Sequence, residues 1–90
     1  MDKTYRKLER IVKGFANHRR ISILELLDKA PELSVIEIST KTNSNFKTIS
    51  EHIRRLAISG LVIKRSVKSS VRHKLTDRGD SILKFLRTLE

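Results

Sequence analysis

The apolar residues in the first third of the chain recur with the spacing of helix faces. Between residues 3 and 15, four of them stand at i, i+3, i+4 and i+7 on one stripe: Leu8, Ile11, Val12 and Phe15. A second helix is predicted over residues 18–29, with Ile21, Leu24 and either Leu27 or Leu26 on its buried side. Pro31 prevents its continuation, because proline has no backbone N–H to donate.

Polar residues mark the start of two further helices. Ser34 and Glu37 have the spacing of a capping box, which predicts a short helix over residues 35–42. The polar run 42–45 favours a turn, and a fourth helix is predicted over residues 46–59, with Gly60 as the left-handed residue that ends it. The predicted core-facing residues of this helix are Phe46, Ile49, Ile53, Leu56 and Ala57.

Beyond Gly60 the pattern changes from helix to strand. Two short β-branched-rich runs, 61–65 and 71–75, flank the mostly polar segment 66–70, which predicts a hairpin with a flexible tip. Thr76 and Asp77 then suit the start of a last helix over residues 77–89. Its apolar stripe consists of Ile82, Phe85, Leu86 and Leu89, widened by Leu83. The chain is therefore expected to be mainly α, with a small β-hairpin, in a single domain over residues 1–90.

The composition limits the partners that the chain can have. Its 90 residues carry a net charge of +10 and a calculated pI of 10.6, which favours an acidic partner: DNA, RNA or an anionic membrane surface. There is no Cys, so disulfides and thiolate metal sites are excluded, and oligomerisation is the expected extra support for so small a core. No apolar run resembles a signal peptide or a membrane span, so we expect a cytoplasmic, nucleoid-associated protein that does not enter membranes. Four scattered aromatic residues argue against single-strand binding.

The positive charge is concentrated on the fourth helix and the hairpin. Residues 43–75 contain eight Lys and Arg against one acid, Glu51, and so hold seven of the ten net charges. The face of the fourth helix opposite its apolar stripe presents side chains that can read base edges or bind phosphate: Ser44, Lys47, Thr48, Glu51, Arg54 and Arg55. Glu51 also has the spacing for ion pairs with Arg54 and Arg55. A short helix, a tight turn and this helix predict a helix-turn-helix on duplex DNA.

The hairpin adds a second cationic surface. Arg72 and Lys74 share one face of the second strand, and Lys64, Arg65 and Lys68 lie near the tip. Cations on a hairpin can simply protect an edge strand from aggregation, just as a basic helix face can simply be solvated. Cations on both strands and on the tip exceed what edge protection needs, so phosphate contact is favoured.

Taken together, these elements resemble a winged helix-turn-helix regulator of the ArsR-like class. The resemblance lies in residues 17–27, 33–38, 48–56 and 59–62, and in the run Leu75-Thr-Asp-Arg-Gly79. It implies a homodimer on a near-palindromic operator. The sequence shows no ligand pocket, so whether a small-molecule effector exists stays unknown. The resemblance also implies a groove-facing set on the fourth helix (Ser44, Lys47, Thr48, Ser50, Glu51, Arg54 and Arg55), to which we add Asn45, and a wing over residues 64–74. The first and last helices would form the dimer interface, through Leu8, Ile11, Val12, Phe15, Leu83, Phe85, Leu86 and Leu89.

The chain departs from the metal-sensing members of that class. Its third helix has no Cys, and its last helix has no His. The three histidines, His18, His52 and His73, stand on different predicted elements and are interpreted as surface or boundary residues rather than as metal ligands. A protonated His52 could contact phosphate. MarR-like proteins share the Leu-Thr-x-x-Gly pattern and form a neighbouring class.

No set of residues indicates catalysis or a bound cofactor. There is no nucleophile with a base and an orienting group, and no Gly-rich phosphate loop, so an enzyme is not expected. The sequence predicts a sequence-specific, double-stranded-DNA-binding transcriptional regulator, a dimeric repressor whose helix 46–59 enters the major groove while the wing 61–75 contacts the flanking backbone or minor groove. Two alternatives stay open: an architectural DNA-binding protein without sequence preference, and a winged-helix module that binds another protein.

Overall fold

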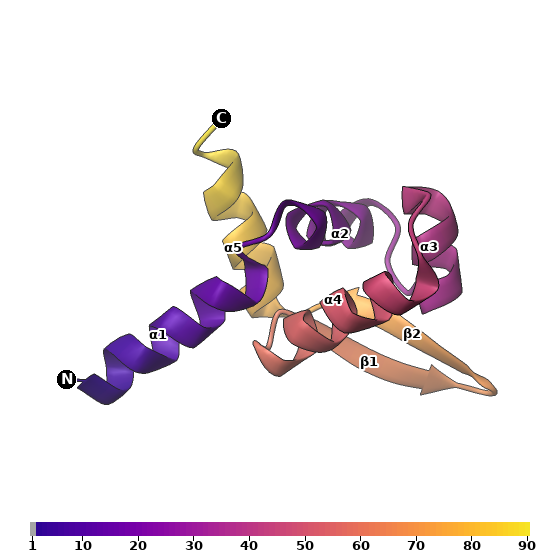
Figure 1. Ribbon diagram of the computed structural model, residues 1–90, viewed down its shortest axis with the longest axis horizontal. Coiled ribbons are helices and arrows are strands. Elements are labelled where there is room, and N and C mark those ends of the chain that lie inside the picture. Colours follow the sequence, from indigo (N-terminus) through magenta and orange to yellow (C-terminus); the bar gives the residue numbers. More distant parts are fainter. Residues whose placement is uncertain (1) are drawn as a thin grey trace.

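Five helices and one hairpin make up the computed structural model, which describes residues 2–90. In chain order they are α1 (Asp2–Phe15), α2 (His18–Lys29), α3 (Val35–Thr42), α4 (Phe46–Ile58), β1 (Val62–Val67), β2 (Ser70–Leu75) and α5 (Asp77–Arg87). Figure 1 shows α1 projecting from the body at one side of the molecule, with α3 and the tip of the hairpin at the other. All the predicted elements are confirmed, although α4 ends one residue earlier and α5 two residues earlier than expected.

Side-chain caps explain why the helices begin where they do. The Ser34 hydroxyl accepts from the Glu37 N–H at 3.2 Å, and Glu37 Oε1 accepts from the Ser34 N–H at 2.9 Å, which confirms the capping box. Asn17 and Asn45 cap α2 and α4 in the same way, each accepting from two backbone N–H groups. Gly60 has φ +76°, the left-handed conformation predicted after α4. Each cap acts over two or three residues, so it can be predicted from sequence.

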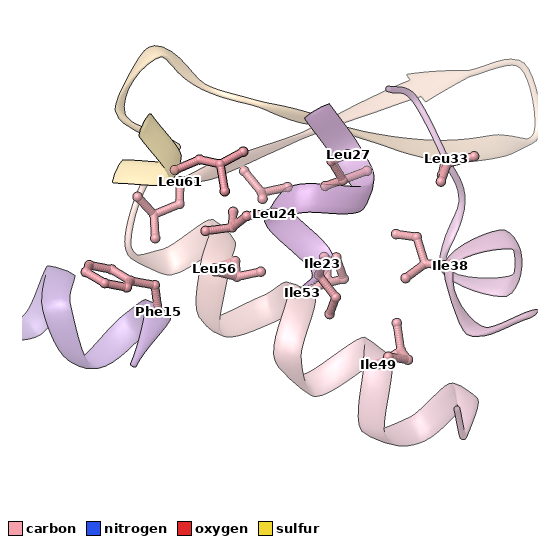
Figure 2. Close-up of a cluster of buried hydrophobic side chains, with 12 residues drawn as sticks. Phe15, Ile23, Leu24, Leu27, Leu33, Ile38, Ile49, Ile53, Leu56 and Leu61 are labelled. Carbon is pink, nitrogen blue, oxygen red and sulfur yellow. The ribbon is translucent and has the colours of Figure 1, made fainter. Parts of the chain in front are cut away.

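The core forms where α2, α3 and α4 meet beneath the hairpin. Figure 2 shows Ile49, Ile53 and Leu56 of α4 directed toward α2 and α3. The buried residues that complete the cluster are Phe15, Ile23, Leu24, Leu27, Leu33, Ile38, Leu61, Val62 and Leu83. Leu24 and Leu27 were predicted on the buried side of α2. Ile23 was not, although it is fully buried, and Ile21 is only half-buried.

The prediction that Phe46 faces the core from α4 is wrong. Its side chain is 53% exposed, whereas Ile49, one turn later, is 1% exposed. Phe46 is the first residue of α4. Helical periodicity places a side chain on a face, but it does not show whether another element covers that end of the face. Phe46 thus belongs to the exposed start of α4.

The hairpin is longer and tighter than predicted. Antiparallel pairing runs from Val62–Leu75 to Val67–Ser70, so the strands occupy most of the segment that was predicted to be a flexible tip. Lys68 and Ser69 alone form the turn, with Lys68 at φ +57°. A bridge between Leu33 and His73 adds the α2–α3 connection to the free edge of β2. The wing is therefore anchored to the body along its base.

His73 is buried, and the prediction that it is a surface or boundary residue is wrong. The residue is 1% exposed, and its Nδ1 lies 2.8 Å from the carbonyl oxygen of Leu33, its partner in the bridge. Burial lowers the pKa of His73, and the hydrogen bond to Leu33 opposes this only in part. The ring is therefore neutral in the folded state and donates its Nδ1–H to Leu33.

We expect His73 to make the protein less stable in acid. Its folded-state pKa lies below the ordinary value of 6.5, so the unfolded chain binds the proton first and stability falls as the pH drops through 6.5 toward the folded pKa. The free energy of unfolding should therefore fall progressively as the pH is lowered from about 7.5 to about 5. Urea denaturation across this range measures it.

The matched variant is His73→Asn, whose amide can still donate to Leu33 but does not titrate. The pH dependence of the variant should be flatter than that of the wild type. His52 titrates in the same direction, but it is common to both proteins and cancels in the difference. Parallel pH profiles for the two proteins would contradict the assignment.

Candidate nucleic-acid interface

The turn between α3 and α4 is held by its own short hydrogen bonds. Asn43 takes the left-handed conformation at φ +51°, and the Ser44 N–H donates to the Ser39 carbonyl at 2.9 Å. The Asn45 side chain then accepts from the N–H groups of Lys47 and Thr48, at 2.7 and 3.3 Å. These bonds fix the angle between α3 and the start of α4, which lie side by side in Figure 1, and the first three residues of α4 are exposed. The arrangement is that of a helix-turn-helix.

The structure keeps most of the predicted groove-facing set of α4 on one exposed face. Lys47, Thr48, Glu51, Arg54 and Arg55 are exposed, opposite the buried stripe of α4. Ser50 is half-buried at the border of this face. Asn45 is exposed, but its side-chain oxygen is used as the cap, so its amide N–H groups are what it can offer to a ligand.

Glu51 holds the two arginines of this face, as predicted from their spacing. Arg54 donates through Nε and Nη2 to the two carboxylate oxygens, both at 2.9 Å, and Arg55 Nε donates to Oε2 at 3.1 Å. These bonds lower the pKa of Glu51 to about 2, so the carboxylate is ionised at any physiological pH. The trio therefore leaves one net positive charge on this face of α4.

Two arginines at the start of α2 join this surface, and the sequence analysis missed them. Arg19 Nη1 donates to Ser44 Oγ at 3.2 Å, and Arg20 Nε donates to His52 Nδ1 at 3.1 Å. Partial burial lowers the pKa of His52, and the positive charges of Arg20 and Arg19 lower it further. His52 accepts from Arg20 in this structure, and the suggestion that it contacts phosphate when protonated stays a prediction. No local pattern links α2 to α4, because the partners stand 25 and 32 residues apart.

The cations of the wing fall into two groups. Arg65 faces the Glu32 carboxylate, with Nε 3.0 Å from Oε1, and Arg72 Nη1 lies 3.1 Å from Glu37 Oε1 and donates to the Glu32 carbonyl at 3.0 Å. These two arginines hold the wing against the α2–α3 connection. Lys64, Lys68 and Lys74 are exposed and make no ion pair with any side chain described in residues 4–90. The lysines are the wing cations with a free charge for a ligand.

The residues of α1 and α5 that are proposed for dimerisation differ in how deeply they are buried. Phe15 and Leu83 are 7% and 1% exposed, so they belong to the core of the protomer and offer no surface to a partner. Ile11 and Leu86 are partly buried against that core. Leu8, Val12, Phe85 and Leu89 are each about half exposed or more, and Tyr5 joins them on α1.

No group of three His, Cys, Asp or Glu side chains in the described part of the chain could hold a metal ion. Among the helices of residues 2–90, none is both long enough and apolar enough to cross a membrane.

A helix-turn-helix followed by a basic hairpin, with cations gathered on α4 and the wing, defines a winged helix-turn-helix DNA-binding domain. The family model of the bacterial regulatory proteins of the arsR family matches residues 17–64, which is more than half of the chain. The chain belongs to this family and is a DNA-binding transcriptional regulator.

Solved structures agree with this assignment. HlyU from Vibrio cholerae, in its reduced form, is 32% identical, with a TM-score of 0.82 over 99% of this chain and 94% of that one. The homodimeric DNA-binding domain of Mb0332 from Mycobacterium bovis, a possible ArsR-family regulator, is 26% identical, with a TM-score of 0.89 over 98% of this chain and 82% of that one. The oxidised form of MarR from E. coli, at 17% identity and a TM-score of 0.77 over 96% and 66% of the two chains, shares the fold. No curated relative matches the sequence significantly.

Proposed function

We propose that the protein is a sequence-specific, dimeric repressor that acts in the cytoplasm and blocks access to a promoter. The observation that supports this most is the exposed face of α4, where Lys47 and Thr48 stand in the first turn and Arg54 and Arg55 follow two turns later. In a helix-turn-helix the start of the second helix contacts base edges. Lys47 and Thr48 would therefore read bases, and Arg54 with Arg55 would bind phosphate or guanine.

Dimerisation is supported by the exposure of α1. From Thr4 to Val12, every residue except Ile11 is exposed, and three of these residues are large and apolar: Tyr5, Leu8 and Val12. A helix that projects in this way buries its apolar face most readily against a second copy of itself. The related Mb0332 domain is described as homodimeric. Two recognition helices would then reach half-sites about one helical turn, ~34 Å, apart.

The wing would contribute phosphate contacts rather than base reading. Lys68 occupies the turn, and Lys64 and Lys74 lie along the strands without ion-pair partners in the described chain. Arg65 and Arg72 would keep the wing at a fixed angle to α4 through Glu32 and Glu37. A rigid wing can then contact the backbone beside the groove that α4 enters.

Selection from a random duplex pool at about 150 mM salt, followed by sequencing of the retained DNA, tests this function. Enrichment of a two-fold symmetric motif with half-sites one turn apart is the expected result. Retention without enrichment would identify an architectural DNA-binding protein. A protein that retains no DNA would use its basic surface for another partner.

The proposed roles of the lysines predict different defects. Lys68→Ala should weaken binding to all duplexes by a similar factor and reduce the slope of log K against log salt by roughly 0.9, the value for one released counterion. Lys47→Ala should instead change the base preference at one or two positions of each half-site. Titrations of a selected site and its single-base variants, at several salt concentrations, separate the two. Equal losses on every sequence from both variants would contradict base reading by Lys47.

A further inference from the structure

An open cavity of about 460 Å³ lies between α1 and the C-terminal end of α4, beside the start of α5. Ile11 and Ile58 supply apolar surface, and Gly14 and Ser59 lie where α1 meets the end of α4. All charged residues that line it are cationic: Lys7, Arg10, Lys13, Arg20, Arg55 and Arg78. No sequence pattern predicts this pocket, because its residues come from four helices.

Few of these charges are neutralised within the protein. Lys13 lies 3.6 Å from Glu9, with both side chains largely exposed, and Arg55 donates to Glu51. Lys7 and Arg10 make no ion pair or side-chain hydrogen bond with residues 4–90, whose side chains the structure describes. Like charges this close repel one another, so an anion in the cavity would relieve that repulsion.

Hydrogen bonds hold part of the cationic wall in place. Arg20 Nη1 donates to the carbonyls of Lys13 and Gly14, at 3.4 and 3.3 Å, while its Nε is held by His52. Arg78 Nη1 donates to the Ser59 carbonyl at 3.0 Å. A Cβ at Gly14 would overlap the Ser59 side chain, which shows how closely α1 approaches the end of α4. The site is thus largely formed before any ligand arrives.

We propose that this cavity binds a small organic anion, with an oxyanion head held by the cations and an apolar part against Ile11 and Ile58. Its volume lies within the range of about 300–1,000 Å³ that is usual for small-molecule sites. An organic phosphate or carboxylate supplies both features. The ligand is a free small molecule rather than a phosphate of the bound DNA, because the cavity is concave and partly apolar.

The position of the cavity also connects it to DNA binding, and this regulatory half of the inference rests on the proposed function. At about 100° per residue, Lys7, Arg10 and Gly14 lie on the side of α1 opposite Tyr5, Leu8 and Val12, so a dimer formed through the latter leaves the cavity open. Arg55 is shared: it lines the cavity and donates to Glu51 on the exposed face of α4. A bound anion lowers the positive potential along α4, so its occupation weakens DNA binding.

Isothermal titration calorimetry with phenyl phosphate, in a phosphate-free buffer and without DNA, tests the site. Saturable binding of phenyl phosphate is expected, with inorganic phosphate weaker and phenol without detectable binding. The Lys7→Gln/Arg10→Gln variant should weaken phenyl phosphate binding by roughly tenfold or more, because it removes two charged donors. The matched control is Arg6→Gln/Lys84→Gln, which removes the same charge from exposed residues outside the cavity and should bind like the wild type.

The same proteins are then titrated with selected DNA, with and without phenyl phosphate. The wild type should lose affinity several-fold when the ligand is present. The Lys7→Gln/Arg10→Gln variant lowers the same positive potential by removing two charges, so it should start from a similarly reduced affinity and no longer respond to phenyl phosphate. Absent or non-saturable phenyl phosphate binding, or inorganic phosphate binding equally well, would overturn the site while leaving the DNA-binding function intact. A salt slope that falls in this variant by roughly 0.9 for each cation removed, as expected for Lys68→Ala, would assign the cavity cations to the DNA backbone. Ligand binding without any change in DNA affinity would overturn the regulatory half.

Discussion

Replacing Leu8 with Asp is expected to convert the protein into monomers and to weaken operator binding by at least about a hundredfold. The Leu8 side chain is 51% exposed on the projecting α1, so a carboxylate there is solvated in the monomer and the fold should persist. In a dimer the same carboxylate would be buried against apolar residues without a partner charge, which is strongly unfavourable. The DNA then loses the second half-site contact, whose effective concentration supplies most of the affinity.

Sedimentation at tens of micromolar protein measures the oligomeric state, and titration of the selected operator measures the affinity. The control is Arg6→Ala, which changes the net charge by the same amount on an exposed part of α1 away from the apolar stripe. This control should remain dimeric and lose little affinity. A wild-type protein that sediments as a monomer, or a Leu8→Asp variant that stays dimeric, would show that α1 does not form the interface.

The sequence predicted the elements well because their boundaries are encoded locally. The capping box of Ser34 and Glu37 and the caps of Asn45 and Thr76 each depend on groups two or three residues apart. A pattern of residue types at such short spacing corresponds to one physical arrangement, the satisfied N–H groups of a helix start. The order of four helices, a hairpin and a last helix can therefore be predicted without knowledge of any tertiary contact.

What the sequence did not predict depends on contacts between distant segments. His73 follows the strand pattern of its neighbours, but the carbonyl that its buried ring contacts belongs to Leu33, 40 residues away. The sequence predicted Arg65 and Arg72 as cations available to phosphate. The fold instead brings Glu32 and Glu37 beside the wing, where they pair with these two arginines. The exposed positions of α4 could be predicted from helical periodicity, whereas the cationic cavity could not, because four helices contribute to it.

Gly79→Ala is expected to destabilise the protein strongly, although alanine is the better helix former. A Cβ at Gly79 would overlap the Leu61 backbone carbonyl oxygen and lie 3.1 Å from the carbonyl carbon. The backbone cannot rotate away as a side chain could, because Leu61 O accepts from the Thr76 N–H and the Thr76 hydroxyl accepts from the Gly79 N–H at 3.0 Å. Thr76 also donates to the Gly60 carbonyl, so the start of α5, the end of α4 and the entry to β1 meet here.

This junction gives a physical reason for the Leu-Thr-x-x-Gly pattern of residues 75–79: a packed Leu, a capping Thr and a Gly without a Cβ. Alanine should gain about 1 kcal/mol in helix propensity. Forcing α5 away from Leu61 should cost about 3 kcal/mol or more, so that the net loss lowers the melting temperature by roughly 10 °C.

Thermal unfolding followed by circular dichroism measures the effect, with Ser81→Ala as the control. Ser81 lies exposed on the same helix, so its replacement changes helix propensity without touching Leu61. The control should melt within a few degrees of the wild type, because exposed substitutions usually change stability by less than about 0.5 kcal/mol. If Gly79→Ala had the same melting temperature as the control, the close approach of α5 to Leu61 would not be the reason that this position requires glycine. Position 79 would then tolerate a side chain, and the Leu-Thr-x-x-Gly pattern would need another cause than packing.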